Sequence, residues 1–329
     1  MVRIRHGWSV VVLGLVLALV AACKKDDPAA DKSGGKSGAG NAVFGEDLAL
    51  IPRDSEVVLG INVSQVQQSG LWKKFVEPAL MTGDAMRRIS DFKTKCGIDP
   101  MTAVKSISIG MKGAAGGKPE GVAVVHGMYK TKALACLDTM KDDMAKDGTE
   151  LSHDGDVVVF KNTKGGPQVA MQYVNDTTAL AVFGEQVNAA SVAAAQASGQ
   201  TLKSSQPFLE MFGKINPGES LWLLLSGKML DKGAALGVKA TAVFGSINVT
   251  DGLTLDLRVQ FATPDDATKF AELAKSQAQQ AAKMFDKADV TPEGKEVKFS
   301  IALSSQKLDA LIAQAKGLLS AFGGGMGGP

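Results

Sequence analysis

The stretch VAMQYVNDTTALAVF (residues 169–183) is the most informative about the fold. Apolar and β-branched residues fill both of its halves, and Asn175-Asp176 between them is a turn-forming pair. The stretch therefore predicts two strands joined by a tight turn, and strands joined in this way are antiparallel. Similar strand patterns occur at residues 57–63, 105–111, 121–128 and 156–161. We expect a largely antiparallel sheet.

Helical periodicity fills several segments between and after these strands. Thr263 has the position of an N-cap, Pro264 that of the first helical residue, and two acidic residues follow where the helix dipole favours negative charge. Further helices are expected from Thr131, over residues 185–197, and from Ser304 or Ser305. Because these segments have one apolar face, the expected fold class is α+β, with amphipathic helices packed on one face of the antiparallel sheet.

Two segments resemble each other and suggest a duplication. PRDSEVV (residues 52–58) matches PGESLWL (residues 217–223) as a turn followed by a strand, which aligns Val57 with Trp222. The strands and helices that follow occur in a similar order. We therefore expect a first α+β module over residues 42–200 and a second over residues 201–322, and residues 323–329 (GGGMGGP) as a disordered tail.

Composition limits the possible functions. The chain has 329 residues, enough for about two domains, with 36 Lys and Arg against 34 Asp and Glu. Arg3 and Arg5 fall in the expected leader, so the rest of the chain is formally neutral. A neutral chain gives no electrostatic reason to expect nucleic acid as a partner.

The N-terminus has the pattern of a removed leader. Arg3, Arg5 and His6 precede an apolar run, and residues 10–22 number only 13, whereas a membrane span needs about 20. The run ends in Leu19-Val20-Ala21-Ala22-Cys23, which resembles the lipobox of bacterial lipoproteins. The alternative is an ordinary secretory leader followed by a chance cysteine. The resemblance covers the first 23 residues alone.

The resemblance implies that residues 1–22 are a signal peptide and that Cys23 is lipidated and anchors the protein to the membrane. Two or more acyl chains would hold the protein firmly. Lys24 departs from the Asp that retains such proteins in the inner membrane, so the outer membrane is the favoured location. Residues 23–41 consist of Cys23 and a charged, Gly/Ser-rich segment, residues 24–41, which predicts a flexible tether with an r.m.s. span of about 23 Å.

Cys96 and Cys136 are the thiols that remain after Cys23. In an oxidising envelope compartment such a pair favours a disulfide, and the alternative is two separately buried free thiols. Sequence does not supply the Cα separation that a bridge needs. Cys96 is expected in a turn before Gly97, and Cys136 in the helix that follows Thr131.

Three motifs suggest chemistry, and each has a structural explanation. His153-Asp154-Gly155-Asp156 could bind metal, but Asp-Gly between strands is a preferred hairpin turn. The run at residues 113–119 lacks the spacing and the Ser or Thr of a phosphate-binding loop, and a hairpin loop explains it better. Ser304-Ser305-Gln306-Lys307 fits a Ser-x-x-Lys pattern without its partner motifs, so a helix cap is expected. His126 is expected at a strand end.

These observations assign no catalytic, cofactor-binding or metal-binding residue. The favoured function is a non-enzymatic binding or scaffolding module, anchored through Cys23, with a possible protein partner in the envelope. The alternative is an envelope hydrolase, or a carrier of lipids or small molecules, whose site is assembled from distant residues.

Overall fold

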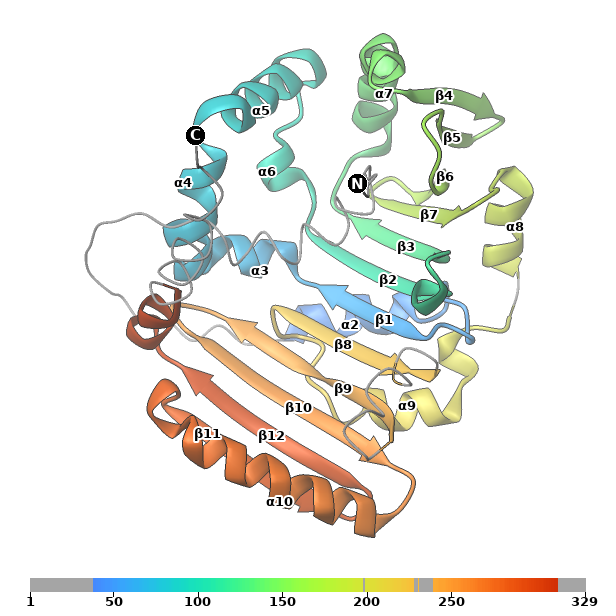
Figure 1. The fold of residues 1–329 in the computed structure, drawn as a ribbon. Helices are drawn as coiled ribbons and strands as arrows, with labels where there is room; N and C mark the ends of the chain where they lie inside the picture. The colour runs from blue at the N-terminus through green and yellow to red at the C-terminus, as the bar shows by residue number, and fades with distance from the viewer. Residues whose placement is uncertain (1–37, 198, 228–229, 231–238, 313–329) are drawn as a thin grey trace, which may run out of the picture.

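The computed structural model describes residues 38–197, 199–227, 230 and 239–312. Its centre is a 12-stranded antiparallel sheet in the order β11-β12-β10-β9-β8-β1-β2-β3-β7-β6-β5-β4 (Figure 1). Helices pack against this sheet, so the α+β class and the antiparallel pairing are confirmed. Cys23 and the expected signal peptide lie outside the described residues, as does the expected C-terminal tail.

The strands are β1 (Val57–Ile61), β2 (Ser106–Lys112), β3 (Glu120–His126), β4 (Thr149–Asp154), β5 (Val157–Asn162), β6 (Gln168–Asn175), β7 (Thr178–Gly184), β8 (Leu221–Ser226), β9 (Ala240–Val249), β10 (Leu253–Phe261), β11 (Lys287–Glu293) and β12 (Glu296–Leu303).

The α-helices are α2 (Gly38–Asp47), α3 (Val63–Gln68), α4 (Glu77–Leu80), α5 (Gly83–Cys96), α6 (Pro100–Ala103), α7 (Lys130–Lys146), α8 (Ala189–Ala197), α9 (Gln206–Phe212) and α10 (Pro264–Gln280). Short helical turns of other types are η2 (Trp72–Val76), η3 (Ala114–Gly116), η4 (Leu202–Ser204) and η6 (Ala282–Met284), and residues 305–312 are also helical. No helix in the described part of the chain is both long enough and apolar enough to cross a membrane.

Local sequence explains the tight hairpins. Asn175 pairs with Thr178 and Asp154 pairs with Val157, so each hairpin has a two-residue loop. The loops begin one residue later than the expected Asn175-Asp176 and Asp154-Gly155. Gly155 has a φ of 61°, a left-handed conformation that glycine adopts without steric cost. The turn explanation of residues 153–156 therefore holds, with this shift.

Helices lie on both faces of the sheet, which corrects the expectation of one covered face. Successive strand residues point to opposite faces. In β7, Leu180 packs in the cluster beneath α8, whereas its neighbour Ala179 packs in the cluster beneath α7. In β9, Phe244 packs with α2 and α9, whereas Val243 packs with α10. The physical reason is visible in β7 and β8, whose apolar runs are nearly continuous, as in strands buried on both faces.

The order of elements occurs twice along the chain. A helix, three antiparallel strands and a second helix appear as α2, β1, β2, β3 and α7, and again as α9, β8, β9, β10 and α10, although the first set also has α3 to α6 between β1 and β2. In each set the last strand returns beside the third, β7 beside β3 and β12 beside β10. The two sets meet where β1 pairs with β8, within one continuous sheet. The division into modules at residue 200 stays a prediction.

The two matched segments do not share the register expected from the sequence. Val58 and Trp222 are both buried in the cluster beneath α2 and α9, so they occupy the same face. Aligning Val57 with Trp222 would place them on opposite faces, because side chains alternate along a strand.

Trp222 lies at the junction of the two sets. It is fully buried, and its indole makes edge contacts with Phe44 of α2 at 5.8 Å and Phe212 of α9 at 5.1 Å between ring centroids. Its strand partner is Gly60, and a Cβ at that position would lie 2.0 Å from Trp222 Nε1. The absence of a side chain at Gly60 therefore allows the indole to lie across β1.

Helix α2 begins inside the segment expected to be a tether. The tether was predicted to reach residue 41, but the helix starts at Gly38. Phe44, Asp47 and Leu48 are buried against the sheet at and just beyond its C-terminal end. Tertiary packing thus outweighs the weak helix propensity of the Gly-rich residues.

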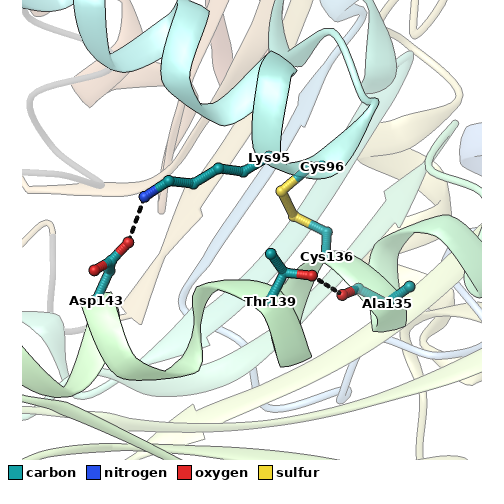
Figure 2. The surroundings of a disulfide bond; sticks show 6 residues. All are labelled: Lys95, Cys96, Ala135, Cys136, Thr139 and Asp143. Atoms are coloured by element: carbon teal, nitrogen blue, oxygen red, sulfur yellow. Dashed lines mark hydrogen bonds and ion pairs between the residues drawn. A yellow bond between two sulfur atoms is a disulfide. The ribbon is translucent and has the colours of Figure 1, made fainter.

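A disulfide joins Cys96 to Cys136, with a Cα–Cα distance of 4.6 Å (Figure 2). This is the pairing that the sequence favoured. Cys96 is the last residue of α5 and not part of a turn, because the helix continues to Gly97, which ends it with a φ of 62°. Lys95 and Asp143 form an ion pair of 2.5 Å beside the bridge. The disulfide therefore attaches α5, which has no buried residue, to α7.

Candidate functional site

The candidate site is a cleft of about 1000 Å³ beside α8, which we call the α8 cleft. Its walls are residues 52–55, which precede β1, and residues 184–187 with α8. Residues 118–122, 182 and 183 and Lys112 complete it, together with Gln200. These segments are distant in sequence, and the sheet brings them together because β1, β2, β3 and β7 are consecutive neighbours.

The floor of the α8 cleft is apolar. Val122 of β3 and Val182 of β7 are partners across the strands. Val122 belongs to the same hydrophobic cluster as Val187. Val182 and Ala195 of α8 pack against this cluster. The floor is therefore an aliphatic surface that is continuous with the core.

The rim of the α8 cleft is charged and carries both signs. Lys112 Nζ lies 2.6 Å from Asp54 Oδ2 and 3.2 Å from Glu120 Oε1. On the other part of the rim, Lys118 Nζ lies 2.8 Å from Glu185 Oε1. With Arg53, the lining holds equal numbers of formal cations and carboxylates.

The rim carboxylates raise the pKa values of the lysines beside them. The hydrogen bond to Asp54 is the main factor that raises the pKa of Lys112, and Glu120 adds to it. The hydrogen bond to Glu185 likewise raises the pKa of Lys118.

Gly110 in β2 allows the cleft wall at residues 52–55 to lie close to the sheet. A Cβ at Gly110 would lie 2.1 Å from Ile51 Cγ2 and 2.8 Å from Ser55 Oγ. Ile51 is fully buried, so the segment that leads into the wall rests directly on the β2 backbone. Ser55 Oγ is engaged in the wall itself, since it donates a hydrogen bond of 2.8 Å to the Pro52 carbonyl.

A second polar cluster lies at the opposite end of β3. Asp47 of α2 accepts hydrogen bonds from Ser108 Oγ at 2.5 Å and from His126 Nε2 at 2.8 Å. Since a carboxylate can only accept, Nε2 carries a proton, and Nδ1 lies within hydrogen-bond distance of Thr178 Oγ1, at 3.0 Å. Asp47, Ser108 and Thr178 are buried.

This cluster holds the end of α2 against three strands. Ser108, His126 and Thr178 belong to β2, β3 and β7. The Asp47 carboxylate therefore connects the helix directly to β2 and β3, and through His126 to β7. His126 is at the strand end expected from the sequence, but its partners were not foreseen. The order Thr178, His126, Asp47 also resembles a nucleophile, base and orienting acid, although Thr178 is only 6% exposed.

We expect Asp47→Ala to destabilise the folded chain by about 2–3 kcal/mol, because it leaves the buried Ser108 hydroxyl and the His126 ring without their acceptor. Urea denaturation followed by circular dichroism would measure this. Glu46→Ala, an exposed position on the same helix, is the matched control and should change stability by less than about 0.5 kcal/mol. Equal effects of the two variants would contradict the assignment.

The other motifs found in the sequence are structural. His153 lies in β4 and reaches Asp138 of α7 at 3.2 Å, on the surface. Lys307 donates to the Phe285 carbonyl and pairs with Asp286 at 3.4 Å, so it is not directed at Ser304. Residues 113–119 connect β2 to β3 as a hairpin loop. Within the described residues, no group of three or more His, Cys, Asp or Glu is placed to hold a metal ion.

Comparisons with known proteins bear on the fold. No family model matches the chain, and no curated protein matches it. The chain is similar to a solved structure described as "Structure of crystal form III of TP0453", with a TM-score of 0.50 and 10% sequence identity. The match covers 81% of this chain and 97% of that one. At this identity the similarity shows a shared fold and nothing about function.

Proposed function

We propose that this protein is a lipid-anchored protein of the bacterial envelope that acts as a non-enzymatic binding module. The lipobox-like Leu19–Cys23 segment supports the anchor, and Lys24 supports the outer membrane over the inner membrane. The α8 cleft is the proposed binding site.

The composition of the α8 cleft is the observation that carries the binding proposal. An aliphatic floor beneath charges of both signs is suited to hold a ligand by burial and to orient it by polar contacts. Both serines of its lining are already engaged, Ser55 with Pro52 and Ser191 with Asn188 at 3.0–3.3 Å. Neither has a histidine beside it in the lining, so binding is better supported there than acyl transfer.

A hydrolase is the second candidate, because Thr178, His126 and Asp47 form a hydrogen-bonded chain. The burial of Thr178 and the second hydrogen bond to Asp47 from Ser108 favour a structural role. Hydrolysis of p-nitrophenyl esters that is abolished by Thr178→Val, in a variant that remains folded, would support the hydrolase instead.

The anchor is tested by fractionating membranes of a diderm bacterial host. The wild-type chain and Lys24→Arg are expected in the outer membrane, whereas Lys24→Asp is expected to move to the inner membrane. Cys23→Ser should leave the membrane fraction after a high-salt wash, because the acyl chains are lost. A Cys23→Ser protein that sediments like the wild type would contradict the proposal.

A further inference from the structure

We propose that the α8 cleft binds a peptide segment in which one apolar side chain is flanked by charged residues of both signs. This inference rests on the proposed binding function and names the class of ligand.

The apolar side chain would rest on the cleft floor. Val182 is half-buried and lies beside Val122, which is only 2% exposed, so Val182 supplies the accessible apolar surface of this strand pair. Ala194 and Ala195 line the adjoining helix face, and their small side chains leave room for an aliphatic group. Burying such a group provides the favourable free energy that charged contacts at an exposed rim supply only weakly.

The rim charges define what flanks the apolar side chain. Lys112 is shared by Asp54 and Glu120, which leaves one negative charge in excess on that part of the rim. Arg53 is exposed, and its guanidinium has no ion-pair partner among the described residues. The rim therefore offers a cation for a ligand carboxylate and, beside it, an acidic group for a ligand ammonium.

This charge balance distinguishes between ligand classes. A phosphate or an anionic polymer would be favoured by an excess of cations, but the lining is formally neutral. A buried acyl chain would require an apolar surround, and six charged side chains line this cleft. A peptide fits better, because it supplies charges of both signs. Its backbone amides can pair with Gln186 and Gln200, whose side chains both donate and accept.

The test uses the purified full chain and a blocked pentapeptide, acetyl-Lys-Glu-Leu-Lys-Glu-amide. Calorimetry measures the affinity, and methyl NMR follows the Val122 and Val182 signals. Matched probes are the same peptide with Gly in place of Leu, sodium palmitate and inorganic phosphate. We expect the Leu peptide to shift both methyl signals and the Gly peptide to bind at least about tenfold more weakly.

Variants locate the charged contacts. Arg53→Ala is expected to weaken binding by about two- to fivefold, and this difference should vanish for a peptide with Gln in place of both Glu residues. Lys269→Ala, an exposed cation on α10, is the control and should bind like the wild type. Arg53 and Lys269 are both surface residues, so loss of folding is not expected to complicate the comparison.

Three results would overturn the peptide assignment. In the first, palmitate shifts the two methyl signals and the Leu peptide does not. In the second, inorganic phosphate shifts them and the Leu peptide does not. In the third, none of the probes binds at millimolar concentration. Palmitate binding would leave the α8 cleft as a binding site with a different ligand. The anchor is judged separately, by the location of the Cys23→Ser and Lys24→Asp variants.

Discussion

Replacing Gly60 with Ala is expected to destabilise the folded chain by about 3 kcal/mol. The added Cβ would lie 2.0 Å from Trp222 Nε1, well inside van der Waals contact. Trp222 is fully buried between Phe44 and Phe212, so it has no free space into which to move. Overpacking a well-packed core typically costs about 1–3 kcal/mol, and the rigidity of this indole places Gly60→Ala at the upper end.

Chemical denaturation followed by tryptophan fluorescence would measure the loss. Gly45→Ala is the matched control, because a Cβ there meets no atom within 4 Å and the residue lies in α2. The control should be neutral or stabilising by up to about 1 kcal/mol, as expected for Gly to Ala in a helix. If both variants have wild-type stability, Trp222 does not lie across β1 as described.

Replacing both Cys96 and Cys136 with Ser is expected to lower stability by about 4 kcal/mol, since the bridge closes a loop with a sequence separation of 40 residues. The effect on α5 should be larger than on the sheet, because α5 has no buried residue to hold it. Denaturation without reductant gives the total loss, and hydrogen exchange over residues 83–96 reports the local release.

Reducing the wild-type protein should reproduce the loss, whereas reductant should not affect the double variant. A loss below about 1 kcal/mol, or unchanged exchange in α5, would contradict the role of the bridge. The neighbouring ion pair offers a second readout. Hydrogen bonds from Lys95 and then Lys146 lower the pKa of Asp143 to about 2.

This depressed pKa means that the ionised Asp143 contributes stability above its ordinary pKa of 3.8, and that the contribution is lost as the pH falls through about 2. In the double variant α5 is released and Lys95 moves away with it. The pKa of Asp143, measured by carboxyl NMR, should then rise towards 3.8, while Lys146 on the same helix continues to lower it.

Local signals in the sequence predicted the individual elements well. Thr263 caps α10 by accepting from the Asp266 amide, with Pro264 in the first turn, because capping depends on neighbouring residues. The hairpin at residues 168–184 followed from strand patterning and a turn pair in the same way. The tight-turn positions were wrong by one residue, since the strand register decides which two residues form the loop.

Arrangements in space were harder to foresee. The helices on both faces were missed because an apolar run such as LWLLLS does not say which element covers each side. The α8 cleft and the Asp47 cluster combine residues far apart in sequence, and Asp47 lies 61 residues from Ser108 and 79 from His126. The buried carboxylate of Asp47 marks this cluster in the structure, but the burial of a side chain cannot be read from the sequence.

The proposed lipid anchor is tested most directly by the intact mass of the chain purified from bacterial membranes. Our account requires a polypeptide that begins at Cys23 and carries a diacylglyceryl group on its sulfur. A chain that still begins at Met1, or one that begins later with an unmodified Cys23 thiol, would contradict it.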